Sequence, residues 1–143
     1  MKMDIKTYKR KTHYYETDKM GIIHHSNYIR WFEEARLDLL DQIGCGYEKM
    51  EEEGIISPVV SVSCNYKAMT KFNEDISIIP VIEEFTGIKL VLSYRVIASE
   101  TGEVKAIGRS EHCFLNEKNR IISLKKSNKK VYDIINEYIK KRV

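Results

Sequence analysis

The clearest pattern in the sequence covers residues 26–43, where apolar side chains recur every three or four positions and charged ones fill the opposite side. Gly44 and Gly46 follow, and glycine readily adopts the left-handed conformation that ends a helix. The pattern predicts a long amphipathic helix with its apolar side in the core. The apolar positions are Tyr28, Trp31, Phe32, Ala35, Leu39, Leu40 and Ile43.

Strand-forming residues dominate four later segments that are separated by short turn signals. Pro80 falls inside the second segment. Because proline cannot donate a ladder hydrogen bond, we expect it at a sheet edge or a bulge. The segments are residues 56–66, 76–85, 89–98 and 104–115, with turns predicted at 86–87 and 100–102.

The remaining segments complete an α+β pattern. Residues 5–16 mix β-branched and aromatic side chains with charges, which suits a strand with one wet face. Residues 48–53 suit a short acidic helical turn, and residues 127–142 have apolar positions at helical spacing. One long helix within an antiparallel strand order predicts an α+β layer fold. A length of 143 residues suits one domain, residues 1–143.

Charge is distributed unevenly along the chain. The formal net charge is +3, but residues 118–143 hold nine Lys and Arg against Asp133 and Glu137, a local net of +7. Such a segment could contact nucleic acid or ligand phosphates, or it could be a solvated helix end, which we favour. The aromatic interleaving of a nucleic-acid stacking surface is absent from residues 118–130, so we expect no nucleic-acid partner.

The sequence predicts a reduced, cytoplasmic protein. It has no apolar run long enough to span a bilayer, and its first twelve residues lack the apolar core of a signal peptide. Its three cysteines are widely spaced, which argues against a disulfide framework or a zinc site. We expect Cys64 and Cys113 to be small core residues of strands, and Cys45, between two glycines, to be exposed.

Four possible metal ligands lie close together in the sequence: Glu16, Asp18, His24 and His25. Adjacent histidines on a helix point about 100° apart, unlike the i,i+4 pair of a zinc helix. We therefore expect no metal site and no cofactor.

Asp18 lies just ahead of the long helix and is the first candidate for chemistry. Helix N-termini present unpaired N–H groups and a partial positive charge, which can stabilise an oxyanion. A carboxylate nearby could act as a nucleophile or as a general base on water. This pairing would give acyl transfer or hydrolysis without Ser, Cys or metal. The alternative is a loop aspartate with only a capping role.

A family resemblance adds to this interpretation. Residues 15–36 read YETDKMGIIHHSNYIRWFEEAR. They closely resemble the signature of the 4-hydroxybenzoyl-CoA-thioesterase-like acyl-CoA thioesterases, which have the hot-dog fold. In that signature an acidic residue, Asp and Gly at fixed spacing lead through a His- or Tyr-containing step into Asn-Tyr and a helix. Residues 62–76 and 110–120 are also similar. The resemblance implies one hot-dog domain, with an antiparallel sheet wrapped around a long central helix.

The resemblance also implies roles for individual residues. Asp18 matches the catalytic carboxylate, and Gly21 matches the turn glycine. His25 matches the position whose backbone N–H polarises the thioester carbonyl, while Asn27 and Tyr28 match the helix start and pocket wall. From the residues themselves, Lys67, Lys71 and Lys89 flank turns, and Lys71 and Lys89 are predicted to meet a CoA phosphate.

The function implied is hydrolysis of an acyl-CoA thioester to CoA and a free acid, with CoA as part of the substrate rather than a cofactor. Two alternatives stay open: an acyl carrier protein (ACP) thioesterase, and an acyl-CoA-binding module without turnover. The resemblance further implies a homodimer or a dimer of dimers (a homotetramer), with the acyl site between protomers. We expect no membrane contact.

Overall fold

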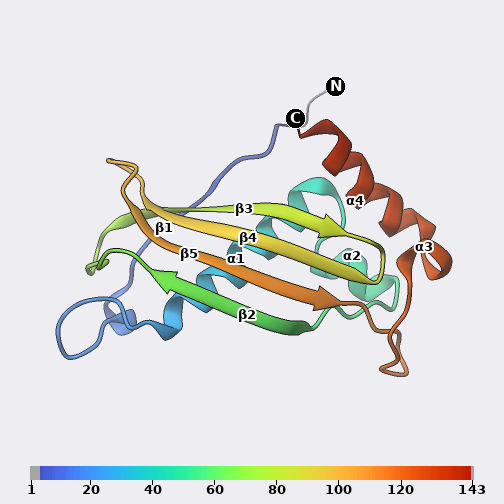
Figure 1. The fold of residues 1–143 in the computed structure, drawn as a ribbon, viewed down its shortest axis with the longest axis horizontal. Helices are drawn as coiled ribbons and strands as arrows, with labels where there is room; N and C mark the ends of the chain where they lie inside the picture. The colour runs from blue at the N-terminus through green and yellow to red at the C-terminus, as the bar shows by residue number, and fades with distance from the viewer. Residues whose placement is uncertain (1–3, 143) are drawn as a thin grey trace.

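A computed structural model describes residues 4–142 and shows a five-stranded sheet with one long helix against it (Figure 1). The sheet has the order β1-β3-β4-β5-β2, and every neighbouring pair is antiparallel. This confirms the predicted α+β architecture. The strands are β1 Tyr8–Lys11, β2 Val59–Tyr66, β3 Asp75–Phe85, β4 Lys89–Ala98 and β5 Val104–Cys113.

The long helix, α1 (Ser26–Ile43), has the predicted bounds, and its apolar side is buried. Phe32 stacks on Tyr94 of β4 with ring centroids 4.5 Å apart. Gly108 of β5 lies directly under the same ring, where a Cβ atom would collide with Phe32. The helix ends at Gly44, which has φ 101° as a left-handed cap. The predicted core helix is confirmed, and Gly108 leaves room in the sheet for the Phe32 ring.

Three shorter helices follow α1, and a single 3-10 turn, η1 (Tyr14–Glu16), precedes it. The predicted terminal helix is confirmed with a break at Asn128, whose side chain accepts a hydrogen bond from the Val131 N–H and caps the last helix. The helices are α2 Tyr47–Glu52, α3 Leu124–Ser127 and α4 Lys129–Lys141. In Figure 1, α3 and α4 lie at the opposite end of the sheet from the loop that precedes α1.

The N-terminal segment differs from the strand predicted over residues 5–16. Pairing with β3 stops at Lys11, because the Thr12 side chain donates to the Lys71 carbonyl at 2.7 Å and holds the chain beside the loop before β3. The chain then turns through η1, where the carboxylate of Glu16 accepts the backbone N–H of His13 at 2.8 Å. One tertiary hydrogen bond and one local hydrogen bond therefore replace the strand pattern.

Cys45 is also placed differently from the prediction. It is fully buried, not exposed, because its backbone N–H bonds the Leu40 carbonyl at 2.9 Å as the chain reverses after α1. Burial raises the pKa of its thiol to about 12. The Cys45 thiol is thus a small core group and not a nucleophile. Cys64 and Cys113 lie in strands, as expected, but are only partly buried.

Pro80 lies where β3 has a neighbour on one side only. It is paired with Tyr94 of β4, whereas β1 pairs only with residues 75–78 of β3. A register shift follows between Ile82 and Glu84. The expectation of a local edge position is therefore met, although β3 is an inner strand. Within residues 4–142, every helix is too short or too polar to cross a lipid bilayer.

Candidate active site

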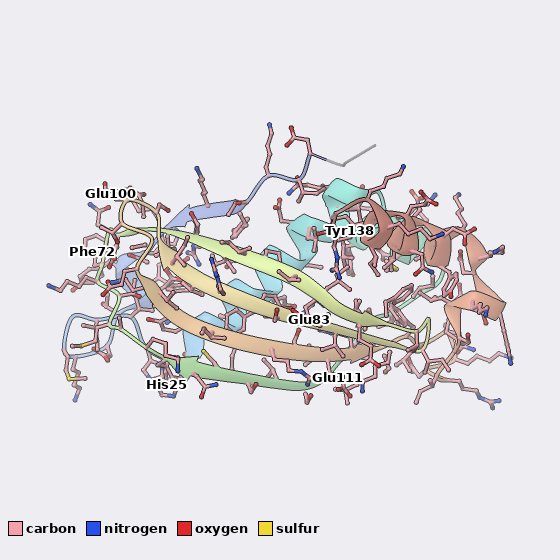
Figure 2. All side chains as sticks on the ribbon, turned by 45° about the horizontal axis from the view of Figure 1, so that its top comes forward. His25, Phe72, Glu83, Glu100, Glu111 and Tyr138 are labelled. Atoms are coloured by element: carbon pink, nitrogen blue, oxygen red, sulfur yellow. The ribbon has the colours of Figure 1, made fainter. Side chains whose placement is uncertain are left out.

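The loop between η1 and α1 brings Asp18 and His25 to one cavity of about 370 Å³. Tyr28 of α1 and Tyr66 at the end of β2 form further walls. Figure 2 shows His25 beside that end of β2. One chain therefore places the predicted carboxylate and the predicted helix N-terminus around the same space. The other lining residues are Met20, Ile22, Ile23, Lys67, Ala68 and Met69.

The shape of the loop is set around Asp18. The Asp18 N–H donates to the Ile22 carbonyl at 2.8 Å, and Gly21 turns the chain at φ 78° with its N–H on the Asp18 carbonyl at 3.1 Å. A side chain at Gly21 would strain this turn. Oδ1 of Asp18 accepts the Met20 N–H at 2.8 Å, while Oδ2 accepts no hydrogen bond from residues 4–142. One carboxylate oxygen is thus held and the other is available.

His25 is the residue that precedes α1, and it already has helical dihedral angles of φ −56° and ψ −28°. Its carbonyl accepts the Tyr66 hydroxyl at 2.9 Å. The N–H groups of Ser26 and Asn27 are taken by the ring and carbonyl of His24, at 3.2 and 3.1 Å. The N–H of His25 has no acceptor among the described residues. A free donor thus remains at the positive end of an 18-residue helix.

Glu16 anchors this loop, a role that the sequence interpretation missed when it grouped Glu16 with possible metal ligands. Its buried carboxylate pairs with Arg10 at 3.1 Å and accepts the Trp31 indole N–H at 2.8 Å. Its carbonyl accepts the His24 N–H at 2.9 Å. The only sequence signal was its place in the motif, because Arg10 and Trp31 meet it through the tertiary fold.

Asn27 and Tyr28, both predicted to bind substrate, have different surroundings. The buried amide of Asn27 donates to the carbonyls of Glu16 and His24, at 2.9 and 3.2 Å, so it fastens the loop and does not line the cavity. Tyr28 lines the cavity and donates its hydroxyl to Thr70 Oγ1 at 3.0 Å. Burial raises the pKa of Tyr28, which keeps its hydroxyl protonated at neutral pH.

The structure does not bring Lys71 or Lys89 into the cavity. Lys71 is bridged to Ile22 through its backbone, but it lines a separate surface hollow. Lys89 pairs with Glu84 and Glu111, at 3.6 and 3.5 Å, at the start of β4. Tyr66, which lines the cavity, is level with Val96 across the sheet, and Val96 lies seven residues, or about 23 Å, along β4 from Lys89. Among residues 4–142, Lys67 is the lysine that lines the cavity.

Potential metal ligands do not cluster in the part of the chain that the structure describes. Across residues 4–142, no three His, Cys, Asp or Glu side chains are grouped so that they could hold a metal ion. His24 instead has its Nδ1 2.9 Å from the Ser26 hydroxyl, and its ring lies 4.2 Å from the ring of His25.

Comparison with known proteins identifies the family. The profile described as the thioesterase-like superfamily matches residues 12–136. The chain belongs to this superfamily. YneP of Bacillus subtilis (strain 168), whose own assignment as an acyl-CoA thioesterase is provisional, is 35% identical over 115 residues, 80% of this chain and 83% of YneP.

Two solved structures of thioesterases extend the comparison. A DHNA-CoA thioesterase from Staphylococcus aureus shares 32% identity at a TM-score of 0.87, covering 94% of this chain and 90% of that one. A gentisyl-coenzyme A thioesterase shares 26% identity at a TM-score of 0.77, covering 87% of this chain and 99% of the other. The hot-dog fold, the superfamily and the assignment as a thioester hydrolase are thereby confirmed.

Proposed function

We propose that the protein hydrolyses acyl-CoA thioesters at the cavity between Asp18 and His25, releasing CoA and a free carboxylic acid. The observation that carries the proposal is the meeting of an available carboxylate oxygen and an unpaired helix N-terminal N–H at one cavity. The similarity to the DHNA-CoA and gentisyl-coenzyme A thioesterases supports CoA as the carrier.

The His25 N–H is proposed to polarise the thioester. It would donate to the carbonyl oxygen, which gains negative charge as the carbon becomes tetrahedral. A donor aimed at such an oxyanion contributes about 3–4 kcal/mol. The preceding loop supports this role, because His24 and Tyr66 occupy the neighbouring backbone groups and leave this donor free.

Asp18 is proposed to bring about attack on the thioester carbon, either through water or directly. As a general base it would take a proton from water while the water oxygen bonds to the thioester carbon. The C–S bond then breaks, and the CoA sulfur leaves with the pair of electrons and is protonated. As a nucleophile, Asp18 would first form an acyl-aspartyl anhydride that water then cleaves. A single turnover in ¹⁸O-water tests for the nucleophilic route, because label enters the Asp18 carboxylate only if an anhydride forms and water attacks its aspartyl carbon.

Asp18→Asn tests the proposal, since it keeps the side-chain shape but removes both the base and the nucleophile. We expect turnover of the best substrate to fall by about 10² or more. Short-, medium- and long-chain acyl-CoAs and aryl-CoAs would be compared with a free-thiol readout. Asp133→Asn, at an exposed position of α4 at the far end of the sheet, is the matched control. Near wild-type turnover by Asp18→Asn would refute the assignment.

The same assay separates the two alternatives. An acyl-ACP thioesterase would prefer the protein-bound substrate, and a binding module would bind acyl-CoA without releasing thiol. An acyl carrier protein would need a docking surface, for which the basic residues 118–143 are the candidate. In this chain α4 lies at the opposite end of the sheet from the loop that precedes α1, which supports the smaller CoA carrier (Figure 1).

A further inference from the structure

A second cavity, of about 620 Å³, lies between the C-terminal half of α1, α2 and the segment that follows α2. It shares no lining residue with the Asp18 cavity. Its size falls in the range of small-molecule sites. Apolar side chains form much of its wall: Leu37, Leu40, Met50, Ile55 and Ile56.

Arg36 is the charged group that distinguishes this cavity. Its side chain is only 9% exposed, yet its nearest carboxylate, Oε1 of Glu33, is 4.0 Å from Nη2. Its Nη1 is 3.4 Å from Nε2 of His112. Guanidinium carries five N–H donors and stays charged at any physiological pH. A buried cation without a close counter-ion is energetically costly, so this cavity is suited to an anion.

The sheet holds Arg36 in place through His112 of β5. His112 is fully buried, and its Nε2 lies 2.7 Å from the Ser110 hydroxyl, which is 2.6 Å from the Tyr94 hydroxyl. Burial and the charge of Arg36 lower the pKa of His112 to about 4. His112 is therefore neutral at pH 7, so it orients the guanidinium without neutralising it.

The rim of the cavity limits the ligand further. Glu33, Glu51 and Glu117 are exposed carboxylates at the cavity, so salt screens their charges much more than that of a buried group. They disfavour a ligand with several negative charges, such as the nucleotide end of CoA. A ligand with a single carboxylate on an apolar body would be repelled less by the rim glutamates and could still pair with Arg36. Guanidinium binds a carboxylate through two parallel hydrogen bonds.

We propose that the α1–α2 cavity binds a small apolar monocarboxylic acid, with its carboxylate on Arg36 and its body against Leu37, Leu40 and Met50. Such an acid belongs to the product class of the proposed hydrolysis, but its binding requires neither turnover nor Asp18. The site is therefore separate from the Asp18 cavity.

Calorimetry with matched probes tests the charge. Octanoate and benzoate would be titrated into wild-type protein beside octanamide and benzamide, which have the same bodies without the charge. We expect each acid to bind at least tenfold more tightly than its amide. Arg36→Met should weaken acid binding at least tenfold. Arg30→Met, an exposed position on the same helix, should leave it unchanged.

Two further variants locate the ligand. Asp18→Asn should bind octanoate like the wild type, whereas Leu37→Trp, which fills the cavity and keeps Arg36, should weaken binding. If Arg36→Met does not fold, Arg36→Lys keeps the charge but loses the planar fork, and it should bind the acids more weakly than the wild type.

Four results would overturn the site: no measurable binding of either acid, equal affinity for acid and amide, wild-type affinity in a folded Arg36 variant, or loss of binding in Asp18→Asn. The last result would place the acid at the Asp18 cavity. Because no assay here measures hydrolysis, failure of the acid site and failure of the proposed thioesterase activity are distinguishable.

Discussion

Two acidic residues that precede α1, Glu16 at the end of η1 and Asp18 in the loop after it, have different roles because their surroundings differ. Glu16 is 4% exposed, and its carboxylate is held by Arg10, Trp31 and the His13 N–H. Asp18, two residues on, is partly exposed and keeps one oxygen without a donor in the described chain. Glu16 therefore has a fixed structural role, and Asp18 is suited to reaction.

Glu16→Gln should destabilise the fold and the loop together. It leaves the nearly buried charge of Arg10 with only its longer contact to Glu34, at 3.4 Å. Breaking a buried ion pair by removing one partner costs about 3 kcal/mol or more. Urea denaturation measures this loss. Exposed Glu52→Gln on α2 is the control, expected within about 0.5 kcal/mol of wild type. Equal losses in both variants would contradict the anchoring role of Glu16.

His112 should make stability depend on pH. Its pKa is lowered to about 4 in the folded protein by burial and by the Arg36 charge, from an ordinary value of 6.5. The unfolded chain therefore binds a proton at a higher pH than the folded one. The neutral His112 therefore contributes about 3 kcal/mol to the free energy of unfolding. This contribution is complete above pH 6.5 and is lost as the pH falls to about 4.

Denaturation of wild type and His112→Gln at several pH values across this window checks the prediction. The variant should show a smaller decrease in unfolding free energy between pH 6.5 and 4. His13→Gln, at an exposed position, should keep the wild-type slope. Parallel slopes for wild type and His112→Gln would mean that His112 protonates equally in both states.

At the scale of elements, the sequence predicted features that depend on one segment alone better than features that depend on contacts between segments. The bounds of α1 follow from its own periodicity and from Gly44, so they could be read from the sequence. The strand prediction over residues 5–16 was wrong beyond Lys11, because Thr12 and Glu16 bond to groups far along the chain. The prediction that Cys45 is exposed was wrong, because its burial depends on the path of the chain after Gly44.

Truncating the buried side of α1 should cost much of the protein's stability. Phe32 and Leu39 are each about 1% exposed, and both changes to Ala would leave a cavity between helix and sheet. The expected loss is about 2–5 kcal/mol for each, measured by chemical denaturation. Ile29→Ala, on the exposed side of the same helix, is the control, expected near 0.5 kcal/mol or less. A similarly small loss for both core variants would place this face outside the core.

For the whole molecule, the motif predicted which residues gather near the helix N-terminus, but not where distant groups lie relative to it. Asp18, His25 and Tyr28 share one cavity because they belong to one short stretch of chain. The position of Lys89 at the far end of β4 depends on strand register, which the sequence pattern does not specify. Arg36 and His112 are 76 residues apart and meet only through the packing of α1 on β5.

The last prediction concerns assembly: the working unit is at least a homodimer, joined through β2. Among the described strands, β2 pairs only with β5, and Val59, Val60 and Val62 on it are exposed. An apolar edge strand invites pairing with another strand unless it is covered. Tyr66 ends β2 and lines the Asp18 cavity, so pairing there would bring a partner chain beside the proposed active site.

Light scattering should therefore give at least twice the chain mass of 16.8 kDa, and turnover should fall as dilution separates the chains. Val62→Lys places a charge on the edge and should shift the equilibrium towards monomer, with a matching loss of activity. Ile107→Lys on inner strand β5 is the control, because the two side chains are similarly exposed, at 40% for Ile107 and 38% for Val62. A fully active monomer would refute a site shared between protomers, since a two-fold interface can complete two sites only while both chains are present.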